Sequence, residues 1–145
     1  MLPTELLISR QVLETYSRAR ISHQIHDTNL ASATILGNYT FYYNQKDKSI
    51  ADGLGLNGYW ESWVTVAMAR LLKPGWHCLD VGANLGYFSV LMADAVGKSG
   101  RVLAIEPYLP LHSYLKRTIE SNNFDQLELI NKAVSSISGE KLDFF

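Results

Sequence analysis

The sequence predicts an α/β fold in which crossover helices connect the strands of a parallel sheet. One observation is the order of elements over residues 77–130, where three strand-like runs alternate with two helix-like stretches. Short connections in this order favour parallel pairing with right-handed crossovers. A second observation is the glycine-containing loop at residues 82–86, which joins the first of these strands to the first helix. The expected strands are His77–Val81, Arg101–Ile105 and Leu127–Ile130, with another at Leu142–Phe145, and the expected helices are Tyr87–Val96 and Leu109–Asn122.

An N-terminal extension, residues 1–57, is expected to precede this unit, which we place at residues 58–145. Apolar spacing predicts an amphipathic helix over Thr4–Ile25, with Thr4 as its N-cap. The run Ala33–Asn44, rich in Thr, Tyr and Ile, predicts a β-hairpin bent at Gly37-Asn38. The other expected elements are a short strand at Ser49–Ala51, a loop at Asp52–Gly58, and a helix at Tyr59–Leu72 that Pro74-Gly75 ends.

Composition and charge place the chain among ordinary globular proteins. Its 145 residues suit one domain, and 47% hydrophobic with 19% charged residues excludes the disordered and fibrous classes. The formal net charge of −1 offers no broad basic field, so we expect neither nucleic acid nor a membrane surface as a partner. The single cysteine, Cys78, excludes an intramolecular disulfide. The four histidines lack metal-ligand spacing, so no metal is expected.

No targeting segment is expected either. No apolar run approaches the roughly 20 residues that a membrane-spanning helix needs. The N-terminus carries Glu5 and lacks the basic region and long apolar stretch of a secretory signal peptide. These features predict a cytoplasmic protein.

The segment with the clearest chemistry is Asp80-Val81-Gly82-Ala83-Asn84-Leu85-Gly86. A buried strand is expected to deliver the chain to Asp80, and the two glycines then allow a sharp turn and the close approach of a ligand. The following helix points its unpaired N–H groups and the positive end of its dipole at the same place. In doubly wound sheets, ligands bind at this end of the strands.

The residue types in this loop favour a cationic ligand over a dinucleotide. A dinucleotide site has the pattern G-x-G-x-x-G, but Asn84 stands where the second glycine would be. The carboxylate of Asp80 would repel a pyrophosphate, whereas it suits the ammonium and sulfonium groups of S-adenosylmethionine. Glu106, at the tip of the next strand, can accept hydrogen bonds from both hydroxyls of a ribose.

Together these motifs resemble those of class I S-adenosylmethionine-dependent methyltransferases and, more narrowly, of the FkbM family. The resemblance covers roughly residues 50–145 and implies a Rossmann-like fold with S-adenosylmethionine as cofactor. It also implies methyl transfer to a small-molecule acceptor, a hydroxyl of a sugar or natural product. It rests on Tyr59-Trp60-Glu61, Lys73-Pro74-Gly75, Asp80 to Tyr87, Glu106-Pro107 and Ile130-Asn131-Lys132-Ala133-Val134-Ser135.

The resemblance implies a role for each matching residue. The methionine part of the cofactor would be surrounded by Asp80, Gly82, Ala83, Asn84 and Gly86. Glu106 would hold the ribose, Pro107 and Tyr108 would lie against the adenine, and its edge would be reached by Asn131, Lys132 and Ala133. Glu61 would close over the pocket from the preceding helix. Simpler alternatives stay open: Asp80 and Glu106 as helix-capping carboxylates, Tyr108 as a packed aromatic, and Glu61 as a first-turn residue favoured by the helix dipole.

The expected methyltransferase fold is incomplete, because the sequence accounts only for the first three strands of its core. The family's fourth strand, with an acidic residue and a Glu-Gly pair, has no counterpart here, so no catalytic residue can be named. We therefore favour the cofactor-binding part of a longer enzyme. A non-catalytic nucleotide-binding or interaction module and a fragment of an NAD-type oxidoreductase are the alternatives. The exposed sheet edge and apolar face of such a half predict a homodimer or an unstable chain.

Overall fold

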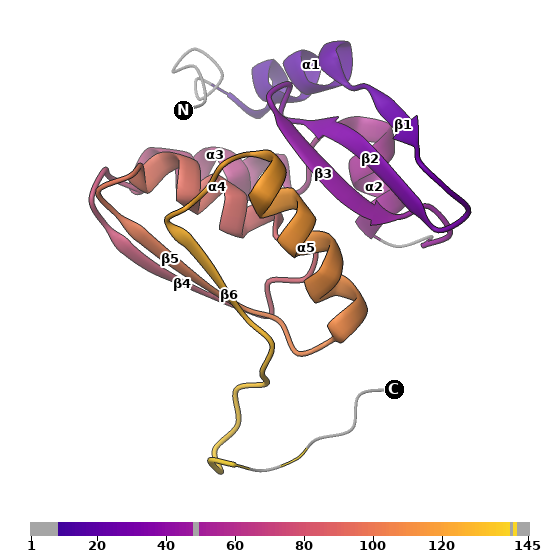
Figure 1. The fold of residues 1–145 in the computed structure, drawn as a ribbon. Helices are drawn as coiled ribbons and strands as arrows, with labels where there is room; N and C mark the ends of the chain where they lie inside the picture. The colour runs from indigo at the N-terminus through magenta and orange to yellow at the C-terminus, as the bar shows by residue number, and fades with distance from the viewer. Residues whose placement is uncertain (1–8, 48–49, 140, 142–145) are drawn as a thin grey trace.

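The computed structural model describes residues 9–47, 50–139 and 141, which form two three-stranded sheets and their helices. The elements in order are α1 (Arg10–Arg20), β1 (His23–Ile25), β2 (Leu30–Ile35), β3 (Tyr39–Asn44), α2 (Ile50–Asn57), α3 (Ser62–Leu71), β4 (His77–Val81), α4 (Tyr87–Val96), β5 (Arg101–Ile105), α5 (Leu109–Ser121) and β6 (Leu127–Ile130). Figure 1 shows α4 and α5 above one face of the β4–β6 sheet, with the β1–β3 sheet beyond α5.

The sheet formed by β4, β5 and β6 confirms the predicted α/β core. β5 lies in the middle and runs parallel to both neighbours, with His77 opposite Arg101 and Val102 opposite Leu127. Val102 and Ala104 of β5 are buried, and α4 and α5 both pack on this sheet. All three strands have the predicted bounds. Helix α5 ends one residue earlier than predicted, and Asn122 is its C-cap.

The opposite face of this sheet is uncovered in the described part of the chain. Leu79 and Val81 of β4 are 57% and 55% exposed, although parallel sheets normally have both faces covered. Among the described residues, β4 pairs with β5 alone. The structure therefore contains the three expected core strands, with one apolar face and one strand edge open.

The N-terminal sheet is antiparallel and contains one strand more than the sequence predicts. The expected hairpin is present as β2 and β3, with Ile35 opposite Tyr39 across the turn. The expected helix over Thr4–Ile25 is wrong at its C-terminal end, because the chain is extended at Ile21 and residues 23–25 form β1 on the edge of β2. Helix α1 has Ser9 as its N-cap, whose Oγ accepts the N–H of Val12 at 3.4 Å. Thr4 lies outside the described residues.

Residues 50–57 form helix α2, so the strand predicted at 49–51 is wrong at residues 50 and 51, and the loop predicted at 52–58 is wrong except at Gly58. The glycines here serve close packing. A Cβ on Gly53 would lie 2.8 Å from the Trp60 ring, and one on Gly55 would lie 2.7 Å from Tyr43 Oη. Tertiary packing thus overrides the low helix propensity of glycine. Residue 49 and the predicted strand at 142–145 lie outside the described residues. The next helix, α3, begins at Ser62 rather than at Tyr59.

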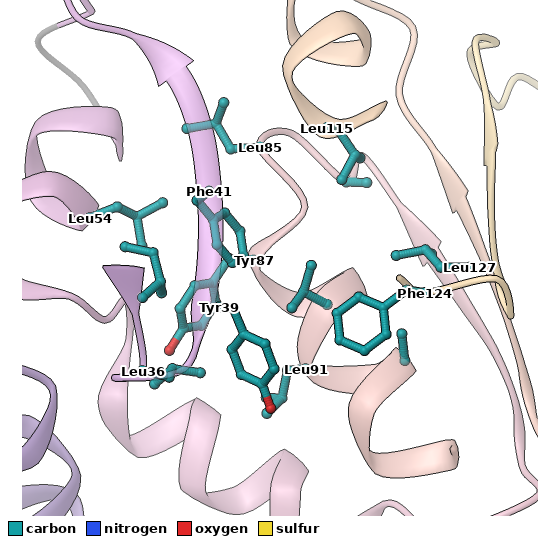
Figure 2. Close-up of a cluster of buried hydrophobic side chains, with 14 of the residues drawn as sticks. Leu36, Tyr39, Phe41, Leu54, Leu85, Tyr87, Leu91, Leu115, Phe124 and Leu127 are labelled. Atoms are coloured by element: carbon teal, nitrogen blue, oxygen red, sulfur yellow. The ribbon is translucent and has the colours of Figure 1, made fainter. Parts of the chain in front are cut away.

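A single hydrophobic core joins the N-terminal sheet to the parallel sheet. Figure 2 shows Phe41 of β3 close to Tyr87 of α4, and their ring centres are 6.3 Å apart. The same cluster includes Leu54 from α2 and Leu115 from α5, both fully buried. The division of the chain at residues 57 and 58 stays a prediction.

The free edge of β3 is closed by side chains of α5. Asn122 accepts the Thr40 N–H at 3.0 Å through Oδ1 and donates to the Thr40 carbonyl at 2.7 Å through Nδ2. The fully buried Thr118 accepts the Tyr42 N–H at 3.1 Å. These contacts satisfy backbone groups that an edge strand would otherwise leave unpaired, and they fix the N-terminal sheet beside α5.

Replacing Asn122 with alanine is expected to lower the free energy of unfolding by about 2–4 kcal/mol. The change leaves the N–H and carbonyl of the half-buried Thr40 without partners, at about 1–2 kcal/mol for each group. Urea unfolding measures the loss, and amide exchange at Thr40 should accelerate. Replacement of the exposed Glu120 of α5 with alanine is the control, expected to change stability by less than about 0.5 kcal/mol. Equal stability of the two variants would contradict the proposed role of Asn122 in holding the edge of β3.

Within the described residues, no helix combines the length and the apolar character needed to cross a membrane.

Candidate cofactor site

The candidate site lies at the carboxyl ends of β4 and β5, where the chain leaves both strands within a few residues. The loop after β4 is held against β5, because the N–H groups of Gly82 and Ala83 both donate to the Ile105 carbonyl, at 2.9 and 3.0 Å. Helix α4 then begins at Tyr87, with Gly86 as its N-cap. The structure thus brings the predicted loop to the tip of the second strand, as a parallel pair requires.

Glu106, the residue after β5, connects the two loops of the site. Its side chain is only 5% exposed. Oε2 accepts the N–H of Asn84 at 2.8 Å, and Oε1 accepts the N–H of Tyr108 at 2.8 Å. Each carboxylate oxygen has a second lone pair, so Glu106 can hold both loops and still accept hydrogen bonds from a ligand.

Asp80, near the end of β4, is the second acidic group of the site. Its Oδ2 accepts a hydrogen bond from the hydroxyl of Ser89, in the first turn of α4, at 2.5 Å. Burial raises the pKa of Asp80 above its ordinary value, the hydrogen bonds from Ser89 lower it, and the negative charge of Glu106 raises it further. No described lysine or arginine forms an ion pair with either carboxylate. A cationic ligand is the partner that such a pair of acids fits.

The raised pKa of Asp80 predicts that Asp80→Asn stabilises the chain at neutral pH and not in acid. The folded chain retains the Asp80 proton over a pH range in which the unfolded chain, with a pKa near 3.8, has lost it. Stability from this group is therefore fully present below 3.8 and is lost as pH rises through the raised folded-state pKa. Asparagine keeps an acceptor for Ser89 but carries no charge. Urea unfolding of both proteins across pH measures the effect, and a difference independent of pH would contradict it.

The two glycines of the loop, Gly82 and Gly86, have different surroundings. Gly82 has φ +78° and open space around it, since a Cβ there would meet no atom within 4 Å. It leaves an exposed cradle that a ligand can fill. Gly86 has φ +81°, but a Cβ there would lie 2.0 Å from Leu115 Cδ1 of α5. The missing side chain of Gly86 makes room for Leu115, which is fully buried. The cofactor contact expected at Gly86 stays a prediction.

The other predicted residues lie around this centre with unequal exposure. Ala83 is buried, and Asn84 has φ +54° with its Oδ1 accepting the Leu85 N–H at 2.7 Å. Pro107 is half-buried, and Tyr108 is 48% exposed at the N-cap of α5. Tyr108 is thus not a packed core aromatic. The cofactor contacts of these residues stay predictions.

Asn131, after β6, supports the loop that follows β5. Its Nδ2 donates to the carbonyls of Glu106 at 2.9 Å and Pro107 at 2.8 Å. Both amide protons are thereby used, and Oδ1 is left as the side chain's acceptor for a ligand. Lys132 is exposed and Ala133 half-buried in the segment beyond β6. The structure therefore links Asn131 by hydrogen bonds to the residues that follow β5. It shows no such hydrogen bonds for the described residues Lys132 and Ala133.

Glu61 lies at the N-cap of α3, exposed, with a left-handed φ of +38° and no side-chain capping bond. Helix α3 is fixed beside the start of α4 by a 2.8 Å hydrogen bond between Thr65 Oγ1 and Tyr87 Oη. Burial raises the pKa of Tyr87 to about 12, and the charge of Glu61 contributes to the rise. The charge of Glu61 therefore acts on the phenol of Tyr87, the first residue of α4. Its predicted role as a cover of the pocket is still a prediction.

Ser89 is the residue of this site that sequence reasoning missed. Its signal was its place in the first turn of the helix after the glycine loop, where a hydroxyl faces back toward the preceding strand. Among the described residues, no group of three or more His, Cys, Asp and Glu side chains is arranged to hold a metal ion. The site offers the buried Glu106, the half-buried Asp80, an open glycine cradle and a helix N-terminus, which fit a ligand with cationic groups and a ribose.

Comparison with known proteins identifies the family. The model of the protein-L-isoaspartate(D-aspartate) O-methyltransferase family matches residues 47–136, which is more than half of the chain. The chain belongs to this family. The predicted class I methyltransferase fold is thereby confirmed, and so is the prediction of a methyltransferase by resemblance. Membership of the FkbM family is not shown.

Two curated relatives are similar over different lengths. A ribosomal RNA large subunit methyltransferase E from Chromohalobacter salexigens is 29% identical over 125 residues, covering 86% of this chain and 57% of the relative. A protein-L-isoaspartate O-methyltransferase from Aeropyrum pernix is 41% identical over 59 residues, covering 39% of this chain and 23% of the relative. The chain thus spans about half the length of the first relative and less of the second.

Solved structures agree on the fold. TYW2 of P. horikoshii in complex with MeSAdo matches 90% of this chain and 50% of its own, with a TM-score of 0.57 and 17% identity. TYW2 of M. jannaschii in complex with AdoMet matches 74% of this chain and 45% of its own, with a TM-score of 0.56 and 19% identity. At these identities the likeness shows the fold alone.

The expected partners are corrected by these relatives. The predicted small-molecule acceptor and the exclusion of nucleic acid are wrong, because the relatives' names give ribosomal RNA and protein L-isoaspartate as acceptors. The expectation rested on a net charge of −1 summed over a chain that matches 57% of its first relative. Such a sum does not describe the surface that meets an acceptor. The cytoplasmic location stays a prediction.

Proposed function

We propose that this chain carries the S-adenosylmethionine-binding part of a methyltransferase with a macromolecular acceptor. The observation that supports it most is the convergence of the Asp80 and Glu106 carboxylates beside the open cradle at Gly82. One buried and one half-buried carboxylate, Glu106 and Asp80, suit the ammonium and sulfonium of this cofactor. Each carboxylate oxygen of Glu106 has a second lone pair with which it would accept a ribose hydroxyl.

In this proposal, the residues of this chain bind and orient the cofactor. When bound, S-adenosylmethionine supplies an activated methyl group. Asp80 attracts the cationic end of the cofactor, and Glu106 holds its ribose while fixing the Asn84 and Tyr108 loops. Tyr108, half exposed beside Glu106, offers a ring face to the adenine. Such positioning supplies much of the rate of an in-line transfer.

A protein carboxylate is the first candidate acceptor. The family model that matches residues 47–136 is that of protein-L-isoaspartate(D-aspartate) O-methyltransferase. A side-chain carboxylate is ionised at neutral pH, so it presents a nucleophilic oxygen without a proton to remove. A hydroxyl acceptor needs a base, and no described residue has been assigned that role. RNA is the second candidate, supported by the relative that matches 86% of the chain.

Transfer of a labelled methyl group tests this proposal. The protein is incubated with methyl-labelled S-adenosylmethionine and either an isoaspartyl peptide or a ribosomal RNA transcript. Label in the peptide, abolished by Glu106→Ala, is the expected result. Label in the RNA alone would select the second candidate. A folded protein that labels neither acceptor would overturn the assignment of a macromolecular acceptor.

A further inference from the structure

Ser89 occupies a position between α4 and β4 that none of the predicted roles uses. It is the third residue of α4, its side chain is 0% exposed, and its Oγ donates to Asp80 Oδ2 at 2.5 Å. A hydrogen bond to a charged acceptor is shorter and stronger than one between neutral groups. The hydroxyl therefore orients Asp80 and favours its ionised form against the effect of burial.

Resting on the proposed function, we propose that Ser89 is a positioning residue for the cofactor: its buried hydroxyl keeps the Asp80 carboxylate ionised and oriented toward the cationic end of S-adenosylmethionine. Ser89 itself does not touch the cofactor in this account. It acts through Asp80, and so its effect on cofactor affinity must depend on pH.

The charges around Asp80 explain why this support is needed. β4 packs against β5 and α4. From the end of β5, Glu106 adds a negative charge that opposes ionisation of Asp80, while Arg101 lies at the far end of that strand, opposite His77. From α4, the group that acts on Asp80 is Ser89, through its hydroxyl and its N–H.

Burial and Glu106 both raise the pKa of Asp80, and the hydroxyl and N–H of Ser89 lower it. Removal of the hydroxyl shifts this balance, so Asp80 stays protonated up to a higher pH. A protonated Asp80 attracts a cation only weakly. Loss of the hydroxyl should therefore weaken cofactor binding most on the acid side, where the wild-type carboxylate is still ionised and the variant's is not.

A second buried serine provides a matched control. Ser62 of α3 is 5% exposed, and its Oγ donates to Glu14 Oε1 of α1, also at 2.5 Å. The chemistry of the two bonds is the same, but Ser62 stabilises the contact between α1 and α3, away from Asp80. Ser62→Ala therefore reproduces the structural loss of a buried serine–carboxylate bond without changing the cofactor site.

The experiment measures the Kd for S-adenosylmethionine by calorimetric titration from about pH 5 to about pH 8. It compares wild type, Ser89→Ala, Ser89→Thr and Ser62→Ala, each checked for folding by urea unfolding. For Ser89→Ala we expect affinity about tenfold weaker at the acid end, a difference that narrows as pH rises. Ser89→Thr, which keeps the hydroxyl, should recover much of the affinity, and Ser62→Ala should follow the wild-type pH profile.

The outcomes separate this inference from the proposed function. If Ser89→Ala binds with the wild-type Kd and pH profile, or loses affinity equally at every pH as a structural defect would, Ser89 is not a positioning residue. If folded wild type binds no S-adenosylmethionine at any pH, the proposed function fails first and the inference with it. If Ser89→Ala does not fold, Ser89→Cys is measured in its place, because it keeps the size but donates weakly.

Discussion

Gly86→Ala is expected to lower the free energy of unfolding by about 2–5 kcal/mol. The left-handed backbone at φ +81° disfavours any side chain, by about 1–2 kcal/mol. The new Cβ would also lie 2.0 Å from Leu115 Cδ1, in a core where overpacking costs about 1–3 kcal/mol. Urea unfolding measures the loss.

Gly82→Ala is the matched control, because Gly82 has nearly the same φ, +78°, but no atom within 4 Å of the added Cβ. It should lose only the backbone contribution of about 1–2 kcal/mol. Gly82→Ala should also weaken cofactor binding, because the added methyl group fills the open cradle. A further check is the double variant Gly86→Ala with Leu115→Ala, which should be more stable than the sum of the single losses predicts. Equal losses for Gly82→Ala and Gly86→Ala would show that Leu115 is not the constraint.

Glu106→Ala is expected to reduce affinity for S-adenosylmethionine by about 100-fold or more, the largest binding effect that the site predicts. The change removes the acceptor proposed for both ribose hydroxyls, and hydrogen bonds to a charged group contribute about 1.5–3 kcal/mol each. It also releases the N–H groups of Asn84 and Tyr108, which loosens both loops of the site. Calorimetric titration measures the affinity.

The stability of the same variant provides a second readout. Loss of the buried carboxylate should lower the free energy of unfolding by about 1–3 kcal/mol for each N–H left without a partner. Glu128→Ala, at an exposed position of β6, should change neither stability nor affinity appreciably. Wild-type affinity in a folded Glu106→Ala protein would rule out the proposed ribose contact.

The parallel sheet was predictable from sequence because its signals are local. β4, β5 and β6 are short runs separated by breaks and helices, and their bounds matched the prediction. The convergence of Asp80 and Glu106 followed from topology alone, since parallel neighbours end at the same edge of a sheet.

The features that sequence analysis missed depend on contacts between residues far apart in the chain. α2 is a helix because Gly53 and Gly55 pack under Trp60 and Tyr43, which a local reading of three glycines as a loop misses. Residues 23–25 pair with β2, although they continued an amphipathic pattern. Gly86 makes room for Leu115, far along the chain, a packing contact that the loop pattern does not reveal. The acceptor was beyond prediction for a similar reason, since the net charge of this chain carries no information about it.

Binding of S-adenosylmethionine by the folded protein tests the proposed cofactor site most directly. Calorimetric titration at neutral pH should show binding of S-adenosylmethionine by wild type, weakened in Asp80→Asn and almost lost in Glu106→Ala. S-adenosylhomocysteine, which lacks the sulfonium charge, should lose less affinity than S-adenosylmethionine when Asp80 becomes asparagine. A folded protein that binds neither compound, or that binds both equally well with Asp80 and Glu106 replaced, would contradict the proposed site.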